Sequence, residues 1–292
     1  MSVYIGDNAK KARAVVGIYV GVNGKAQRVK NAYVGINNRA KQCYTDGPKI
    51  WTWEEVFAAE LDGTYSTKFK LGDIAQIDKQ VFIDGGLLAD LDWPDKTIDM
   101  QIVAFDTDTL SDDSGKAKIS WVSNNCLYGS KMGSQAYDWA SCDIRQALRT
   151  NVFSCLPADL QAAIKTVVKT YHKQDGTDGE VADTIWIPSM YELTNGKNTS
   201  QGIEATGVSY GEWFYPNDSA TNKVGKEHRK KTANRTLDGI TAQRINAPYW
   251  TRTMVNSQSL ANSYRIVYSD GTLNQTTPYS STGTYIPLGF CT

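Results

Sequence analysis

The sequence has few of the residues on which metal sites and enzyme active sites are most often built. It contains only two histidines, His172 and His228, and five cysteines without CxxC spacing. Zinc sites need several Cys or His ligands at close spacing, so we expect no metal site. The P-loop and the GxGxxG motif are also absent. Their absence argues against the common kinds of nucleotide-binding site. We therefore expect a protein that is not an enzyme and has no cofactor.

Long apolar runs and a charge of one sign are missing as well. No apolar stretch reaches the roughly 18 residues of a membrane-spanning helix, and residues 1–11 lack the apolar core of a signal peptide. We expect no membrane insertion, and synthesis in the bacterial cytoplasm. Residues 1–44 hold eight Lys or Arg and one acid, whereas the remainder holds 23 basic and 30 acidic residues. The acidic remainder argues against nucleic acid as a partner.

A short repeat is the clearest feature of the N-terminal region. Tyr19-Val-Gly-Val-Asn-Gly-Lys-Ala26 and Tyr33-Val-Gly-Ile-Asn-Asn-Arg-Ala40 match at a spacing of 14, and a looser copy begins at Tyr4. Asn and Gly tolerate the positive φ of a tight hairpin turn, so each copy predicts a strand, a turn and a returning strand. Three small hairpins bury little surface alone. The module either packs on a partner chain or on the main domain, or it is a local meander.

The pattern breaks at Asp46-Gly-Pro48, which predicts a β-hairpin module over 1–46 and one larger domain over 47–292. Thr52 and Glu55 have capping-box spacing and predict a helix start. Ser141 is predicted to cap a second helix, and Pro157 to begin a third whose apolar side extends to Val168. A helical turn is expected at 189–193. Strands are predicted at 68–71, 80–83, 99–105, 116–122, 184–187, 249–252, 264–268 and 285–290.

Two polar regions raise the question of ligands. Asp106, Asp108, Asp112 and Asp113 surround a predicted hairpin turn and could present carboxylates to calcium. The glutamate that closes an EF-hand is missing, which favours a solvated acidic turn. Residues 195–247 predict a long irregular loop, and such loops often serve binding.

The C-terminal region has an unusual composition: between Tyr249 and Tyr285, 21 of 37 positions are Asn, Ser, Thr or Tyr. These side chains combine short donors and acceptors with amphipathic contact area, as antibody paratopes do. An exposed polar sheet would have the same composition. Trp250, Ile266 and Val267 are predicted to lie in the core, because adjacent apolar residues fit a strand covered on both faces.

Six short motifs occur in an order that resembles a known family. They are Gln101-Ile-Val-Ala-Phe-Asp106, Ile119-Ser-Trp-Val122, Ser141-Cys-Asp-Ile-Arg145, Ile185-Trp-Ile-Pro-Ser189, Tyr249-Trp-Thr-Arg-Thr253 and Ile286-Pro-Leu-Gly-Phe-Cys291. Over about residues 60–292 the chain resembles the C-type-lectin-like domains of gut bacteria and their phages, which are related to formylglycine-generating enzymes and to variable proteins of diversity-generating retroelements. The resemblance implies an α+β fold in which two helices pack on short twisted antiparallel strands.

The N-terminal repeats resemble segments of phage and prophage tail proteins. Together the two resemblances imply a receptor-binding protein of a phage tail in the virion, with a diversified C-terminal face. Its partners would be a host cell-surface protein or glycan and, through residues 1–46, other tail proteins; a homo-oligomer such as a trimer would add avidity. The expected ligand contacts are Trp213, Tyr215, Thr251, Thr253, Asn256, Gln258, Asn262, Tyr264, Asn274 and Tyr279.

The departures from these families limit what the resemblance implies. The calcium motifs of sugar-binding C-type lectins are absent, and the cysteines do not match the catalytic pair of formylglycine-generating enzymes. We therefore expect neither calcium-dependent sugar binding nor oxidase activity. The rival hypotheses are a purely structural tail or baseplate subunit, and a catalytic relative, oxidase or hydrolase, on the same fold.

Overall fold

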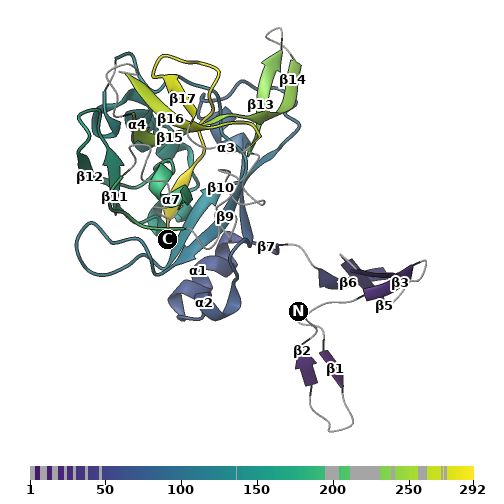
Figure 1. Cartoon of the computed structure of the whole chain (residues 1–292). Helices are drawn as coiled ribbons and strands as arrows, with labels where there is room; N and C mark the ends of the chain where they lie inside the picture. The colour runs from purple at the N-terminus through teal and green to yellow at the C-terminus, as the bar shows by residue number, and fades with distance from the viewer. Residues whose placement is uncertain are drawn as a thin grey trace. The chain divides into compact units, whose positions relative to one another are not determined.

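The computed structural model describes residues 4–6, 12–14, 19–22, 25–28, 31–36, 39–45, 48–135, 137–194, 204–210, 231–237, 241–255, 262–270, 272 and 275–292 (Figure 1). The chain divides into two compact units, Met1–Ile50 and Trp51–Thr292. The boundary therefore lies at residue 50, where the sequence pattern had placed it at residue 46. Among the described residues, none of the helices has the length and hydrophobicity that a bilayer crossing requires.

The first unit contains the three predicted hairpins, each a separate two-stranded antiparallel sheet. The first strand of each hairpin contains the tyrosine with which one repeat copy begins, Tyr4, Tyr19 or Tyr33. The pairs are β1 (Tyr4–Gly6) with β2 (Ala12–Ala14), β3 (Tyr19–Val22) with β4 (Lys25–Arg28), and β5 (Asn31–Ile36) with β6 (Arg39–Thr45).

The larger unit is built on a five-stranded sheet in the order β18-β10-β9-β8-β7. The strands are β7 (Ile50–Trp51), β8 (Ile74–Asp78), β9 (Thr97–Phe105), β10 (Ile119–Ser123) and β18 (Gly289–Cys291). Every residue of β10 is buried, as expected for a central strand that is covered on both faces. The predicted hairpin of β9 and β10 is confirmed, and so is the C-terminal strand, which pairs with β10.

Three smaller sheets complete the β structure. In β15 and β16 every residue is buried, so the prediction that Trp250, Ile266 and Val267 belong to the core is confirmed. The sheets are β11 (Val167–His172) with β12 (Asp178–Asp183), β13 (Lys231–Leu237) with β14 (Thr241–Ala247), and β15 (Tyr249–Met254) with β16 (Ser263–Val267) and β17 (Gln275–Pro278).

The helices are short. The predicted capping box is present at α1 (Trp53–Leu61): the Thr52 hydroxyl accepts from the Glu55 backbone N–H, and the Glu55 carboxylate accepts from the Thr52 N–H. The others are α2 (Tyr65–Lys68), α3 (Gln80–Asp84), α4 (Asp143–Ala147), α5 (Phe153–Cys155), α6 (Ala158–Ala163) and α7 (Met190–Thr194), with a 3₁₀ turn at Trp139–Ser141 and a π turn at Leu148–Val152. The unit combines short helices with antiparallel sheets, and this mixed content is compatible with the predicted α+β class.

Several predicted elements are wrong in type. Of residues 68–71, predicted as a strand, Lys68 ends α2, residues 69–70 are irregular and Leu71 begins a turn, while residues 80–83 belong to the helix α3. The intrinsic strand preference of Val81, Phe82 and Ile83 is overridden, because one helical turn buries Phe82 completely while the Asp78 carboxylate accepts from the Gln80 N–H. The strand of this region is β8, which the sequence pattern did not reveal.

Two further boundaries differ. The predicted third helix ends at Ala163, and Val167 and Val168 belong to β11, where their branched side chains suit a strand. The predicted loop 195–247 contains the hairpin of β13 and β14. Of residues 184–187, Ile185, Trp186 and Ile187 are buried as predicted and Thr184 is half-buried, but the segment contributes a single bridge between Trp186 and Gly289 and no full strand.

Gly289 allows the Trp186 indole to lie directly against β18. A Cβ atom at Gly289 would lie 2.2, 2.3 and 2.7 Å from three carbon atoms of the Trp186 ring, which is fully buried. We expect Gly289→Ala to lower the free energy of unfolding by about 1–3 kcal/mol, because the ring has no room to yield. Gly283→Ala is the control, since nothing lies within 4 Å of its added carbon. Urea unfolding measures both; equal stability of the two variants would contradict this packing.

Candidate functional site

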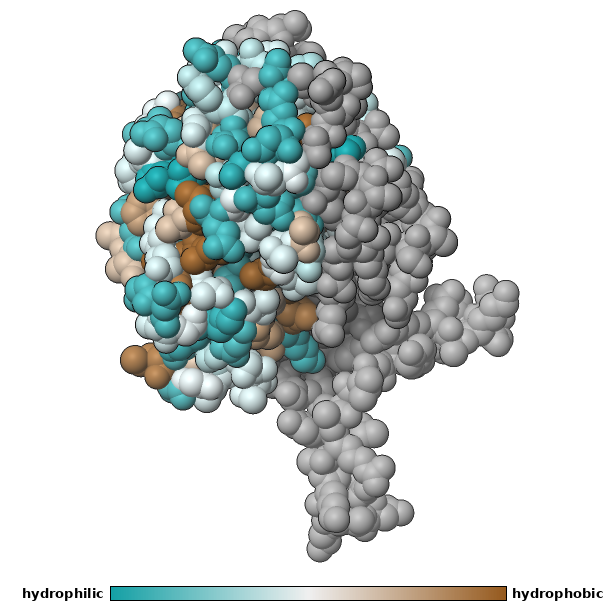
Figure 2. Space-filling model, turned by 60° about the vertical axis from the view of Figure 1, so that its left-hand side comes forward, coloured by the Kyte–Doolittle hydropathy of each residue, from teal (hydrophilic) through white to brown (hydrophobic). Residues whose placement is uncertain are grey.

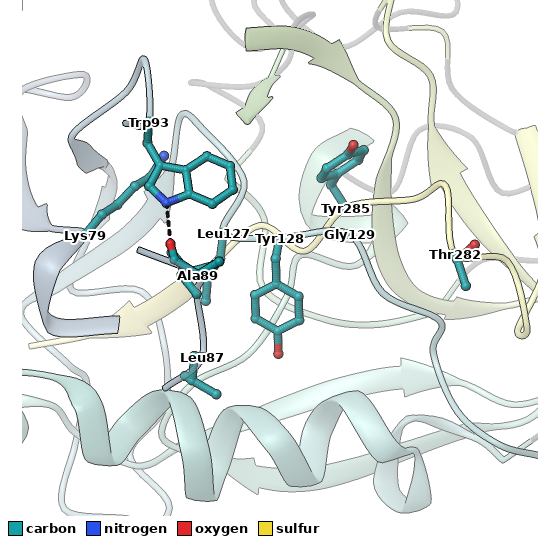
Figure 3. A pocket seen from close by; sticks show the side chains of 10 residues that line it. Lys79, Leu87, Ala89, Trp93, Leu127, Tyr128, Gly129, Thr282 and Tyr285 are labelled. Carbon is teal, nitrogen blue, oxygen red and sulfur yellow. Dashed lines mark hydrogen bonds between the residues drawn. The ribbon is translucent and has the colours of Figure 1, made fainter. Parts of the chain in front are cut away.

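A cavity of about 390 Å³ lies where three separate segments of the larger unit meet (Figure 3). The first segment runs from Lys79 through residues 87–93, the second is 127–129 after β10, and the third comprises residues 282–285 before β18. Its wall carries three aromatic rings and four aliphatic side chains. The lining residues are Lys79, Leu87, Leu88, Ala89, Trp93, Leu127, Tyr128, Gly129, Thr282 and Tyr285. We call this cavity the aromatic pocket.

The loop after α3 positions Trp93. Gly86, with φ of +73°, turns the chain back, and the Leu87 and Leu88 N–H groups both donate to the Phe82 carbonyl, at 2.8 and 3.2 Å. The Trp93 indole Nε1 then donates to the Ala89 carbonyl at 3.0 Å, within the same loop. The indole is thus held in place by its own loop, with its ring left for the pocket.

The other two aromatic rings lie on segments bound to each other. The Leu127 N–H donates to the Ile286 carbonyl at 2.8 Å, and the Ile286 N–H donates to the Tyr128 carbonyl at 2.9 Å. Gly129 forms a bridge with Tyr285. In Figure 3, Tyr128 lies between the Trp93 end of the pocket and the end that carries Tyr285 and Thr282. Backbone pairing therefore fixes the spacing of the rings.

The pocket combines apolar faces with polar edges. Burial raises the pKa of the Tyr128 hydroxyl, so this group stays protonated at neutral pH and can both donate and accept. Thr282 adds a second hydroxyl, and Lys79 an ammonium group. Such a wall suits a small ligand with an apolar face and hydroxyl groups around its edge.

A second, very different cluster of polar residues lies inside the domain. The Lys169 ammonium donates to Asp108 at 2.5 Å, to Glu192 at 3.1 Å and to the Tyr210 hydroxyl at 2.7 Å. Arg252 donates twice to Glu192, at 2.6 and 2.8 Å. None of these five residues is more than 1% exposed. We call them the buried charge cluster.

The charges of the cluster stabilise one another. Burial disfavours the charge of Lys169, but Asp108 and Glu192 outweigh it and raise the pKa of the lysine. Likewise burial is outweighed at Asp108, whose pKa is lowered by Lys169 and by its hydrogen bonds. The Lys169 ammonium also lies 3.5 Å from the centre of the Trp186 ring. These groups bond to each other and face no solvent, so they hold β11, β15 and α7 together.

Asp108 corrects the expectation of a solvated acidic turn. It is fully buried in the cluster, because Lys169, Ser120 and Tyr210 supply the hydrogen bonds that water would otherwise make. Asp106 accepts from the Tyr65 hydroxyl and Asp112 from Ser114. No group of three or more His, Cys, Asp or Glu that could hold a metal ion occurs in the described part of the chain.

The catalytic alternative, a hydrolase on this fold, would need a nucleophile placed beside a base such as His172. The sequence contains a GxSxG, Gly207-Val-Ser-Tyr-Gly211, but residues 204–210 are neither strand nor helix, whereas hydrolases place this serine on a strand-to-helix turn. His172 Nδ1 lies 2.7 Å from Asp178. Its Nε2 is buried and has no hydrogen-bond partner among the described residues. Among the residues that the structure describes, no nucleophile is bonded to this pair as a triad requires.

The predicted ligand contacts are scattered. Thr251, Thr253 and Tyr264 are fully buried, so they are corrected from surface contacts to core residues. Their hydroxyls donate to the Arg265 carbonyl, to Glu204 and to the Tyr137 carbonyl, which satisfies them inside the domain.

Asn262 is exposed and Tyr279 half-buried, and the structure brings these two together, because the Tyr279 N–H donates to the Asn262 carbonyl at 3.0 Å. Neither lines the aromatic pocket. The remaining predicted contacts, Trp213, Tyr215, Asn256, Gln258 and Asn274, lie outside the described residues.

Sequence reasoning missed the aromatic pocket, although Thr282 and Tyr285 come from the region that was singled out. Trp93 carried a signal: it stands in Leu91-Asp-Trp-Pro-Asp95, where turn residues surround a large aromatic with no strand or helix to bury it. Tyr128 had no comparable signal.

Comparison with known proteins gives one family. No match to the chain is found among curated proteins or among solved structures. A family model described as a domain of unknown function, DUF6273, matches residues 120–288. The match includes the second and third segments of the aromatic pocket and begins after the loop that carries Trp93. It covers more than half of the chain, and the chain therefore belongs to the DUF6273 family.

Proposed function

We propose that this chain is a non-catalytic binding protein and that its aromatic pocket holds a sugar unit of a glycan. The observation that carries the proposal is the pocket wall, in which Trp93, Tyr128 and Tyr285 present aromatic rings and the two tyrosines and Thr282 add hydroxyl groups. A pyranose ring has the matching chemistry, an apolar C–H face and a rim of hydroxyls. Aromatic side chains with polar ends serve such ligands well.

The size of the cavity favours a glycan over a protein as the ligand. A volume of about 390 Å³ lies in the range of pockets for small ligands, whereas a stable protein partner needs about 800 Å² on each side. On the face of the described residues that Figure 2 shows, hydrophobic residues form small areas separated by hydrophilic ones. This distribution supports a local pocket rather than a broad apolar interface.

The wider biological role follows from the sequence resemblance. We propose a receptor-binding protein of a phage or prophage tail, with a C-type-lectin-like fold in the larger unit and attachment to other tail proteins through the hairpins. The three separate hairpins of the first unit support attachment, because two-stranded sheets are marginal alone. A purely structural subunit is the alternative, and it predicts that no glycan binds.

Trp93→Ala tests the function directly. We expect a loss of glycan affinity of at least about tenfold, because a few buried aromatic anchors carry much of the binding energy of a site. Binding is measured for the full chain on an array of bacterial-surface and simple glycans, and then by calorimetry on the bound glycans. Tyr268→Ala is the control, since Tyr268 is 44% exposed and lies outside the pocket.

The test also needs a variant that preserves packing. Tyr128→Phe removes one hydroxyl and keeps the ring, so a weaker affinity with an unchanged unfolding midpoint would identify direct contact with the ligand. Wild-type protein that is folded and binds no glycan of the array would overturn the proposed function. Equal affinities of wild type and Trp93→Ala would place the site elsewhere.

A further inference from the structure

A second cavity, of about 320 Å³, adjoins the aromatic pocket. The two cavities share Lys79 and Trp93 as lining residues. In Figure 3 these two side chains lie together at one end of the aromatic pocket, opposite Thr282. The second cavity therefore begins at that end, and the Trp93 indole is a wall of both.

We infer that the ligand is an oligosaccharide of at least two units, which passes from the aromatic pocket across Trp93 into this second cavity. The inference rests on the proposed function and extends it from one sugar unit to a chain. The loop of residues 87–93 supports the inference, because this loop lines both cavities. A hydrogen bond within the loop, from Trp93 to Ala89, fixes the indole that forms the shared wall. A ligand that fills only one cavity would leave half of this built surface without a role.

The chemistry of the second cavity differs from that of the first. Its walls carry the Asp78, Asp90 and Asp92 carboxylates, the Gln80 amide and the Lys96 ammonium beside Ile83 and Leu91. Asp78 accepts from the Gln80 N–H, and Asp92 is paired with Lys96. Asp90 is exposed, and no hydrogen bond to its side chain occurs among the described residues. Each carboxylate has lone pairs left that can accept from sugar hydroxyls.

The charges of this cavity also select the sugar. Its three carboxylates exceed its two ammonium groups, Lys79 and Lys96, and Lys96 is already paired. A uronic or sialic acid unit would place a like charge beside Asp90, which opposes binding. The second unit of the ligand is therefore a neutral sugar.

The experiment measures affinity against chain length. Full-length protein is titrated with the neutral oligomers of one to four units that give signals on the array, and with matched oligomers that contain one uronic acid. We expect the second unit to raise affinity by about tenfold, the gain of one or two net hydrogen bonds, and the acidic oligomers to show no such gain.

A matched pair of variants assigns the gain to its cavity. Gln80→Ala with Asp90→Ala removes polar groups of the second cavity only, and it is expected to abolish the gain while single-unit affinity is unchanged. Tyr128→Phe, in the aromatic pocket, is expected to weaken every length equally. Single-unit binding without any gain on lengthening would overturn the inference and leave the proposed function standing. Absence of binding to every glycan would overturn both.

Discussion

Replacing Glu192 with glutamine is expected to lower the free energy of unfolding by about 3–5 kcal/mol, the usual cost of breaking a buried ion pair on one side. The Glu192 carboxylate accepts two hydrogen bonds from Arg252 and one from Lys169, at 2.6 to 3.1 Å. An amide of the same shape removes the charge and turns one acceptor into a donor. Lys169 would keep its bond to Asp108, whereas Arg252 would lose the carboxylate that accepts two of its hydrogen bonds.

Glu192 has a second role that the substitution also weakens. Its carboxylate accepts from the Ser189 N–H at 2.9 Å, and the Ser189 hydroxyl accepts from the Glu192 N–H at 3.2 Å. This reciprocal pair is a capping box at the start of α7, worth on the order of 1 kcal/mol. One side chain therefore fixes the helix start and ties it to β11 and β15.

The matched control is Asp92→Asn, the same chemical change in an exposed pair. Asp92 and Lys96 have side chains 97% and 68% exposed, so their pairing contributes little in water. Urea unfolding followed by tryptophan fluorescence reports on the larger unit, because all eight tryptophans lie beyond residue 50. A loss below about 1 kcal/mol for Glu192→Gln would mean that the cluster is not closed to water.

Local signals in the sequence were reliable where the structure depends on neighbours in the chain. The Thr52–Glu55 capping box predicted the start of α1 because its partners are three residues apart. The Asn-Gly and Asn-Asn turns predicted the N-terminal hairpins for the same reason. The hairpin of β9 and β10 has strand-forming residues on both sides of a polar turn.

Elements that depend on distant partners were not predictable in this way. Val167 and Val168 fit the apolar periodicity of a helix. They nevertheless belong to the strand β11, because they pair with residues of β12. Polar residues of the C-terminal region were read as exposed, but Thr251 and Thr253 find acceptors across the domain. A hydroxyl that can be satisfied inside gives no sign of burial in the sequence.

The aromatic pocket shows the same limit. Trp93, Tyr128 and Tyr285 are separated by up to 192 positions in the numbering, and only the pairing of residues 127–129 with residues 285–286 brings two of them together. A single sequence contains no pattern that relates them. The isolated tryptophan in a turn was the one available signal, and it marks a candidate contact without its partners.

Lys231 is expected to make stability depend on pH. Its side chain is fully buried; its ammonium donates to the Ser123 carbonyl and lies 5.2 Å from the centre of the Tyr249 ring. None of the described carboxylates bonds to it. Burial lowers the pKa of Lys231 from 10.5 to about 8, and Cys126 acts in the opposite direction. The folded state therefore binds this proton less tightly than the unfolded state does.

The direction of the effect follows from proton binding. Below about pH 8 the lysine is protonated in both states, and the folded state bears the full cost of the buried charge. Between about pH 8 and 10.5 the unfolded state holds more protons, so this residue's contribution to stability rises with pH. The shift in pKa corresponds to about 3 kcal/mol. Burial raises the pKa of the neighbouring Cys126 to about 12, which opposes the rise.

Lys231→Met isolates this contribution, because the other groups, apart from the coupled Cys126 thiol, titrate alike in both proteins. The variant also loses the bond to Ser123, which changes its stability by the same amount at every pH. From pH 7 to pH 10 we expect the wild type to gain about 2 kcal/mol of stability relative to the variant. Urea unfolding at four pH values measures it, with exposed Lys116→Met as the control for the loss of one lysine. A difference independent of pH would mean that Lys231 keeps its charge in the folded protein, and that an anionic partner or water reaches it.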